Sequence, residues 1–130
     1  MVKILSVVGA RPNFMKIDPV LRALECDAGR FSSVLVHTGQ HYDDNMSRVF
    51  FHDLGLRTPD IDLGVGSGTH AEQTAAIMVR IEQALIAHQP DLVLVVGDVN
   101  STLATTITAA KMHSPVGHVE AGLRSFDRGM

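Results

Sequence analysis

The chain has 130 residues, of which 45% are hydrophobic and 19% charged, and its formal net charge is −3. This length is enough for one domain with a hydrophobic core of its own. The acidic balance argues against a general nucleic-acid-binding protein, which normally carries a basic excess, but it leaves room for a local basic site that binds a phosphorylated small molecule.

Short apolar runs alternate with longer segments in which apolar residues recur at helical spacing. Each run ends at a glycine or a polar turn, as buried strands of a parallel sheet do. In chain order we predict a strand at 4–8, a helix at 12–26, a strand at 34–36, a helix at 46–54, a short edge strand at 61–63, a helix at 70–88, a strand at 92–96, a helix at 100–113 and a strand at 116–119.

Strands that alternate with helices of this length predict right-handed crossovers and an α/β fold with a parallel sheet. We expect one Rossmann-like domain over residues 1–130, with helices on both faces and the strand order 3-2-1-4-5 of half a doubly wound fold. The residues that should turn the long helix at 70–88 toward the core are Ala71, Thr74, Ile77, Met78, Ile81 and Leu85, with Ile86 alongside.

Four polar clusters follow predicted strands, at 9–12, 38–41, 97–100 and 120–124. Because the carboxyl ends of parallel strands lie at one edge of a sheet, the four clusters should converge there. The first and third should flank the crevice that opens where the chain reverses its direction of winding. We therefore expect the functional residues among these clusters.

Two cations belong to the first cluster or follow it closely. Arg11 lies between Gly9 and a predicted helix, where backbone N–H groups favour an anion and a guanidinium can bind a phosphate through two hydrogen bonds; the alternative is a solvated loop arginine. Lys16 lies one helical turn beyond Pro12, where a surface lysine is the default interpretation and a functional lysine the alternative. The glycine pattern is not G-x-G-x-x-G, so we expect no dinucleotide, and no other cofactor.

Two carboxylates are candidates for acid–base chemistry. Asp98 follows Gly97 and precedes a helix, so it is either a carboxylate at or near the N-cap of that helix or a general acid or base tuned by partial burial. Glu120 is the stronger candidate, because Gly122 lets a ligand approach the backbone closely. Carboxylates on adjacent strand ends can divide the acid and base roles between them.

The seven histidines do not predict a metal site. His37 and His41 share no helical face, since Gly39 lies between them, and no second cluster has ligand spacing. His118, inside the last predicted strand, is expected to be packed in the core or to support a neighbouring residue.

Four sequence blocks, taken together in this order and spacing, are highly specific. They are GARPNFMK at 9–16, HTGQHYD at 37–43, GDVNST at 97–102 and HVEAGLRS at 118–125. With these blocks the chain resembles, over essentially its whole length, the non-hydrolysing UDP-N-acetylglucosamine 2-epimerases.

The resemblance implies two Rossmann-like domains in the glycosyltransferase-B arrangement, with a UDP-sugar in the cleft between them. It implies elimination of UDP from C1 and C2 of the sugar to give a 2-acetamidoglucal, followed by re-addition with the proton on the other face. The family's catalytic positions carry over onto Asp98 and Glu120 for acid–base work and onto Arg11 and Lys16 for charge stabilisation near the diphosphate. Substrate contacts are expected from Arg11, His41, Asn100, Gly122 and Arg124.

Two departures from the family pattern bear on function. The family's Pro-Glu-Glu-x-Asn-Arg block should begin just after Met130, and the second domain is absent, so we expect an N-terminal domain that is inactive alone. Residues 40–44 read Gln-His-Tyr-Asp-Asp, where members regulated by their own substrate carry a Gln-His-Arg-Glu-Met type block, which argues against that regulation. Relatives that epimerise UDP-2,3-diacetamido-glucuronic acid share the form found here, so the identity of the sugar stays open. A second alternative is a non-catalytic module that only dimerises.

The resemblance also implies a homodimer with a role in cell-surface polysaccharide biosynthesis. From composition and charge we expect a cytoplasmic protein with no membrane or nucleic-acid partner. Apolar surface suited to pairing lies on Met46, Val49 and Phe50 and on the helix at 70–88. The single Cys26 cannot form an internal disulfide, which suits a reducing cytoplasm. No apolar run approaches the roughly 20 residues of a membrane span.

Overall fold

The computed structural model describes residues 1–9, 11–39, 55 and 57–120, and the predicted helix at 46–54 lies outside these ranges. The described strands form one parallel sheet in the order β3-β2-β1-β4-β5, which confirms the predicted order. The elements are β1 (Val2–Val8), α1 (Arg11–Glu25), β2 (Phe31–His37), β3 (Ile61–Asp62), α3 (His70–His88), β4 (Leu92–Val96), α4 (Asn100–Lys111) and β5 (Val116–Val119).

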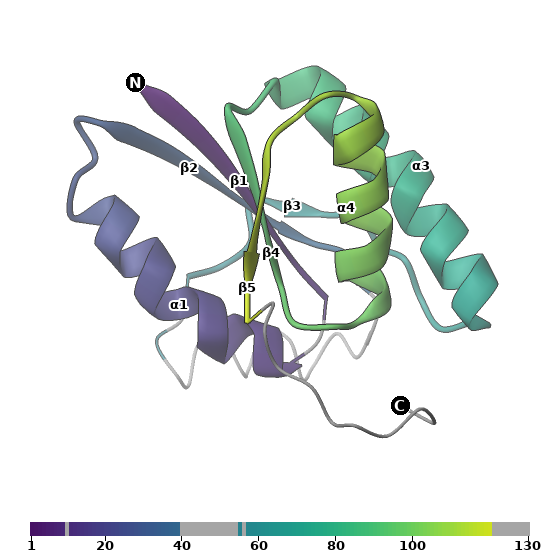
Figure 1. Ribbon diagram of the computed structural model, residues 1–130. Helices are drawn as coiled ribbons and strands as arrows, with labels where there is room; N and C mark the ends of the chain where they lie inside the picture. The colour runs from purple at the N-terminus through teal and green to yellow at the C-terminus, as the bar shows by residue number, and fades with distance from the viewer. Residues whose placement is uncertain (10, 40–54, 56, 121–130) are drawn as a thin grey trace.

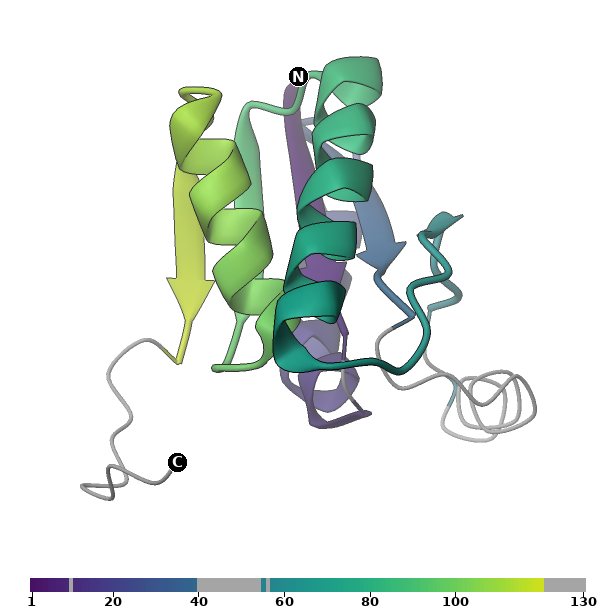
Figure 2. The same ribbon diagram turned by 90° about the vertical axis from the view of Figure 1, so that its right-hand side faces the viewer.

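Helices cover both faces of the sheet, as predicted (Figure 1). α1 covers one face, and α3 and α4 lie side by side on the other (Figure 2). Successive residues of β1 divide between the two faces. Val7 belongs to the apolar cluster beneath α3 and α4, and Val8 belongs to the cluster beneath α1. Strands buried on both faces form continuous apolar runs, which is why these strands could be predicted from the sequence.

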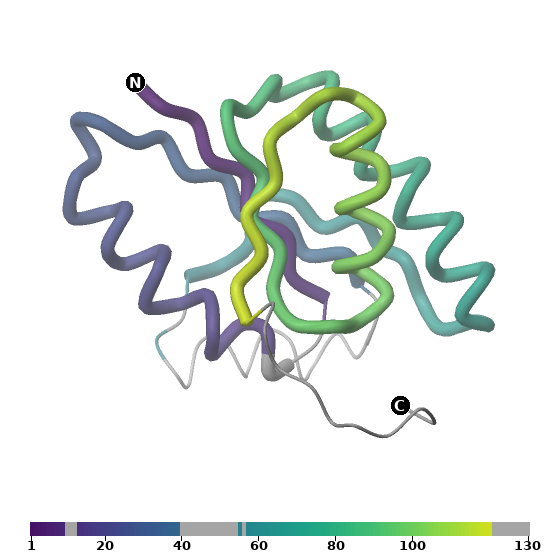
Figure 3. The backbone as a smooth tube through the Cα atoms, viewed as in Figure 1, coloured from purple at the N-terminus to yellow at the C-terminus, as the bar shows by residue number. Residues whose placement is uncertain are grey.

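β1 lies at the centre of the sheet and pairs with both β2 and β4. Val7 stands opposite Val36 of β2 and Val95 of β4. The chain passes from β1 through α1 to β2 on one side, and it returns through α3 to β4 on the other side of β1 (Figure 3). The direction of winding therefore changes between β1 and β4, and the carboxyl ends of these two strands mark the switch point.

α3, β4 and β5 have the predicted bounds, whereas other elements differ at their ends. β1 begins at Val2 rather than at residue 4. β2 begins at Phe31 rather than at residue 34, since its first residues pair with the first residues of β1. The sequence did not indicate this start, because Ser32 interrupts the apolar pattern. α4 ends at Lys111, because His113 has a left-handed backbone with φ of 62° that cannot continue a right-handed helix.

The buried face of α3 differs in part from the prediction. Its buried residues are Ile77, Ile81, Ala84 and Leu85. Ala71, predicted to face the core, is exposed in the first turn. Ile86 is 59% exposed, because it lies about 100° around the helix from Leu85. No helix in the described part of the chain is long and apolar enough to cross a membrane.

Asp60 holds the start of β3 against β2. Its Oδ2 accepts a hydrogen bond from the N–H of Leu35 at 2.8 Å and another from Nη2 of Arg57 at 2.6 Å. Arg57 also donates to the carbonyl oxygen of Ser33 at 2.7 Å. The carboxylate therefore satisfies a strand N–H and a guanidinium at the same time.

We predict that Asp60→Ala lowers the free energy of unfolding by about 1–3 kcal/mol, because it leaves the Leu35 N–H without its acceptor. Urea unfolding of the chain, followed by circular dichroism, measures this loss. The matched control is Asp27→Ala, which removes an exposed ion pair with Arg30 at 3.4 Å and should cost less than about 1 kcal/mol. Equal losses in the two variants would contradict the proposed role of Asp60 as the acceptor for the Leu35 N–H.

Candidate functional site

The carboxyl ends of the parallel strands meet at one edge of the sheet, where α3 and α4 also begin (Figure 2). This edge holds described residues of all four predicted clusters, namely 9, 11–12, 38–39, 97–100 and 120. Thr38 of the second cluster contacts Ser101, which follows the third cluster, and Lys16, which follows the first cluster, contacts Glu120 of the fourth. The first residue of α4, Asn100, contacts α3. The predicted convergence is therefore confirmed for the described residues.

Lys16 and Glu120 form an ion pair at this edge. The distance between Nζ and Oε2 is 2.6 Å, and the side chains are 38% and 30% exposed. Lys16 lies in α1 and Glu120 directly follows β5, so the pair joins residues 104 positions apart. Glu120 has a left-handed backbone with φ of 66°, which costs a non-glycine residue roughly 1–2 kcal/mol. Strained backbone of this kind gathers at functional sites.

Asp98 does not cap α4. The N-cap is Val99, and no side chain caps the helix. Asp98 is exposed rather than partly buried as predicted, and its carboxylate has no hydrogen-bond partner among the described residues. The carbonyl oxygen of Gly97 lies 2.6 Å from Nε2 of His118. His118, exposed on β5, therefore supports the turn that carries Asp98.

Gly9 stands where side chains of two other elements meet. Oγ1 of Thr38 and Oγ of Ser101 are 2.8 Å apart, and both residues are buried. A Cβ atom on Gly9 would lie 1.9 Å from Oγ of Ser101 and 2.8 Å from Oγ1 of Thr38. Gly9 also donates its N–H to Oδ1 of Asn13 at 3.3 Å. Ser101 was not among the predicted site residues, because nothing in its local sequence places it against β1.

Asn100, a predicted substrate contact, is the first residue of α4 and is half-buried. Its Nδ2 donates to Oε1 of Gln73 at 3.0 Å and lies 3.0 Å from Nδ1 of His70. Gln73 and His70 come from the first turn of α3 and were not predicted to belong to the site. Only the packing of α3 against α4 could identify them.

The remaining predicted site residues lie outside the described part of the chain, namely the side chain of Arg11 and all of His41, Gly122 and Arg124. Within the described part, His37 is buried, and its ring meets Phe14 edge-on at 5.1 Å between centroids. No group of three or more described His, Cys, Asp or Glu residues is arranged to hold a metal ion.

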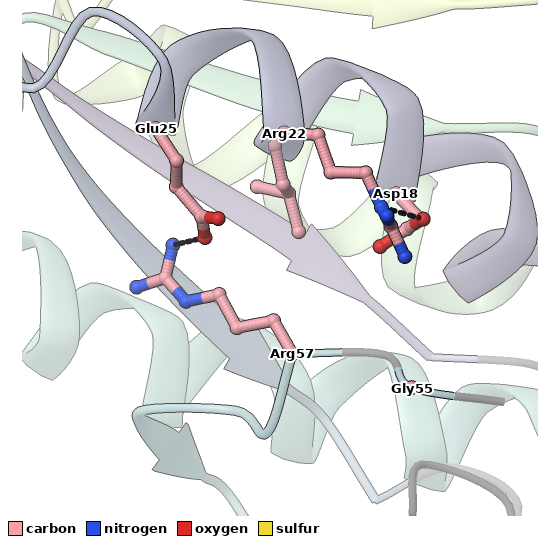
Figure 4. A pocket seen from close by; sticks show the side chains of 6 residues that line it. Asp18, Arg22, Glu25, Gly55 and Arg57 are labelled. Carbon is pink, nitrogen blue, oxygen red and sulfur yellow. Dashed lines mark hydrogen bonds and ion pairs between the residues drawn. The ribbon is translucent and has the colours of Figure 1, made fainter. Parts of the chain in front are cut away.

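A cavity of about 320 Å³ lies apart from these clusters, between α1 and the segment with Gly55 and Arg57. Its lining residues are Asp18, Leu21, Arg22, Glu25, Gly55 and Arg57. Figure 4 shows that the charged side chains pair with one another, Arg22 with Asp18 at 2.7 Å and Arg57 with Glu25 at 3.5 Å. None of them belongs to a predicted cluster, so the cavity is not the candidate site.

The sequence itself matches known proteins. A family profile described as UDP-N-acetylglucosamine 2-epimerase matches residues 22–130. A UDP-N-acetylglucosamine 2-epimerase homolog of Methanococcus maripaludis is 47% identical over 98% of this chain and 35% of its own length. A UDP-2,3-diacetamido-2,3-dideoxy-D-glucuronate 2-epimerase of Pseudomonas aeruginosa is 46% identical over 98% of this chain and 36% of its own length. The chain thus spans about a third of the length of these relatives.

Solved structures agree with these matches. The UDP-GlcNAc 2-epimerase of Methanocaldococcus jannaschii in complex with UDP-GlcNAc and UDP has a TM-score of 0.91 and 45% identity, over 99% of this chain and 35% of that one. The Neisseria meningitidis enzyme bound to UDP-GlcNAc has a TM-score of 0.86 and 32% identity, over 97% of this chain and 33% of that one.

We predict that Gly9→Ala lowers the free energy of unfolding by about 1–3 kcal/mol or more, because the new Cβ must displace Ser101. Adding Ser101→Gly should recover much of the loss and give a coupling above about 1 kcal/mol in a double-mutant cycle. Gly29→Ala is the control, since no atom lies within 4 Å of its added Cβ. Strictly additive losses at Gly9 and Ser101 would show that their contact does not govern the edge.

Proposed function

The chain belongs to the UDP-N-acetylglucosamine 2-epimerase family, and from this premise we propose that it is the N-terminal domain of an enzyme that interconverts UDP-N-acetylglucosamine and its manno epimer. The observation that carries the proposal is the similarity, over 99% of the chain, to an enzyme crystallised with UDP-GlcNAc and UDP. The paired Lys16 and Glu120 and the exposed Asp98 add reactive groups at the edge where a doubly wound sheet holds its ligand.

The proposed reaction has two stages. In the first, a base removes the C2 proton while the bond from C1 to the UDP oxygen breaks, which gives a 2-acetamidoglucal and UDP. In the second, UDP adds back at C1 and C2 takes a proton on the opposite face. Both stages move only a proton and the UDP group and transfer no hydride, so the proposed reaction requires no redox cofactor.

Two carboxylates suit this chemistry, because the proton leaves one face of the sugar and returns to the other. Asp98 and Glu120 follow the adjacent strands β4 and β5, whose register places Val96 opposite Val119. In the proposal these two residues divide the acid and base roles. Their places on paired strands keep both carboxylates at the same edge.

Lys16 and Arg11 are the cations of the proposal. Elimination places additional negative charge on the departing diphosphate, and a preorganised cation nearby stabilises that charge. The ammonium of Lys16 is 2.6 Å from Glu120, so Lys16 also holds an acid–base group in place. Arg11 begins α1, next to the backbone N–H groups of the first turn.

A related sugar gives a second candidate function. Identity to the Pseudomonas aeruginosa diacetamido-glucuronate epimerase is 46%, between the 47% and 45% found for the two methanogen proteins named UDP-N-acetylglucosamine 2-epimerase or its homolog. The Gln-His-Tyr-Asp-Asp form at 40–44 points to the same relatives. Both sugars therefore belong in the assay.

We expect the longer protein that contains this domain to convert UDP-N-acetylglucosamine to its manno epimer, whereas residues 1–130 alone give no turnover above background. The reason is that this chain spans about a third of the relatives' length. Proton NMR in D₂O measures the conversion, and deuterium should enter at C2. Turnover of only the diacetamido-glucuronate substrate would favour the second candidate function. Turnover by residues 1–130 alone would refute the expectation that this domain is inactive by itself.

Within that longer protein, we predict that Asp98→Asn and Glu120→Gln each lower kcat by about 100-fold or more, as expected for positioned acid–base groups. The KM for the UDP-sugar should change much less. The matched control is Asp91→Asn, since Asp91 precedes β4 at the opposite end and accepts a hydrogen bond from the N–H of Lys3 at 2.7 Å. A near-normal kcat in either test variant would remove that residue from the mechanism.

We also propose that the domain forms a homodimer through α3. Val79 and Ile86 are 61% and 59% exposed, and residues seven apart lie on the same face of a helix. A two-fold dimer brings the same surface of both copies together, so the interface would bury Val79 and Ile86 of each copy. The other predicted contributors, Met46, Val49 and Phe50, lie outside the described residues.

Light scattering at micromolar concentration should report twice the chain mass. The double variant Val79→Glu with Ile86→Glu should be monomeric, because an interface buries the new charges at a high cost. Leu103→Glu is the control, since Leu103 is 54% exposed on α4 and should leave the dimer intact. A monomeric parent chain would overturn the proposal, and a dimeric double variant would exclude α3 as the interface.

A further inference from the structure

Asn100 is held by a chain of polar groups that ends at a backbone carbonyl. α3 and α4 begin next to each other at the carboxyl edge of the sheet (Figure 2). Nε2 of Gln73 donates to the carbonyl oxygen of Gly66 at 3.2 Å. Oε1 of Gln73 accepts from Nδ2 of Asn100 at 3.0 Å, and the same Nδ2 lies 3.0 Å from Nδ1 of His70.

The carbonyl of Gly66 sets the direction of every bond in this chain. A backbone carbonyl can only accept, so the amide group of Gln73 must turn its NH₂ toward Gly66 and its oxygen toward Asn100. Asn100 must then present its NH₂ to Gln73. This assignment follows from the network of donors and acceptors, which is how the two ends of a carboxamide are told apart.

The second hydrogen of the Asn100 NH₂ is directed to His70. Nδ1 of His70 must therefore accept, which requires a neutral imidazole with its proton on Nε2. Both donor positions of Asn100 are then occupied by protein groups. Its Oδ1 has no partner among the described residues and is an acceptor only.

We propose that His70 and Gln73 are positioning residues that lock the Asn100 carboxamide so that Oδ1 receives a donor group of the ligand. On the proposed function, on which this inference rests, that donor is a hydroxyl or amide N–H of the UDP-sugar. A phosphate oxygen is excluded as the partner, because both an amide oxygen and a phosphate oxygen accept. Asn100 therefore recognises the non-phosphate part of the substrate.

The protonation of His70 tests the network without any activity. In ¹⁵N NMR spectra of residues 1–130 at about pH 8, where an ordinary imidazole is neutral, His70 should show the Nε2–H tautomer with a bare Nδ1. Asn100→Asp should reverse this, because a carboxylate can only accept and so favours a proton on Nδ1. A wild-type Nδ1–H tautomer, or no response to Asn100→Asp, would overturn the network. This outcome does not depend on whether the protein is an epimerase.

Kinetics of the longer protein test the role in recognition. His70→Ala and Gln73→Ala should each raise the KM for UDP-N-acetylglucosamine about fivefold to tenfold, as for a lost hydrogen bond, and change kcat by less than about twofold. His70→Asn should restore the KM, because its side-chain oxygen can replace Nδ1 as acceptor. Inhibition by inorganic pyrophosphate, which offers no hydroxyl or N–H of a sugar or base, should be unchanged in all variants.

Two results would overturn the recognition role while leaving the epimerase assignment intact. The first is an equal loss of pyrophosphate inhibition and UDP-sugar binding in His70→Ala, which would indicate general damage to the site. The second is an unchanged KM in both alanine variants. Absence of epimerase activity in the unsubstituted protein, with the expected His70 tautomer, would instead refute the proposed function and keep the network.

Discussion

The close approach of α4 to the end of β1 is the constraint on which the edge of the sheet depends. It exists because Gly9 has no side chain, which lets Ser101 reach the position that a Cβ would occupy and bond to Thr38. The ends of β1 and β2 and the start of α4 are thereby brought together, since β1 lies between β2 and β4. Asn100 immediately precedes Ser101, so its place at the edge follows from the same approach.

Electrostatics then distinguish the two carboxylates at this edge. Glu120 is paired with Lys16, which is a cation supplied by α1. Asp98 is exposed and has no partner among the described residues. The two carboxylates therefore differ in their surroundings although they follow neighbouring strands. The asymmetry arises from which helix packs near each strand end, and not from the local sequence of either residue.

Much of the fold could be predicted from the sequence, because strands buried on both faces and a helix with an apolar stripe have clear local patterns. β4 and α3 are the clearest cases. The first part of β2 could not be predicted, since Ser32 interrupts its apolar run. The exposure of Ile86 was also missed, because a helix pattern does not say where the covered stripe ends.

The candidate site shows more clearly that local sequence patterns do not predict contacts between distant elements. Lys16 and Glu120 were predicted site residues, and the parallel topology explains why they meet. Gln73 and His70 could not be identified, because their contact with Asn100 depends on how two helices lie against each other. The expectation that Asp98 is the N-cap of α4 was wrong, since Val99 takes that position, and Asp98 is exposed rather than partly buried.

The register of β4 and β5 has a consequence for how such a site can change over time. Val96 is opposite Val119, so the spacing of the groups that follow is a property of the sheet and its hydrogen bonds. Insertions in a surface loop leave that ladder untouched, because loops lengthen at little cost in stability. The positions of strand-end groups can therefore be inherited as part of the framework, while the segments around them diverge.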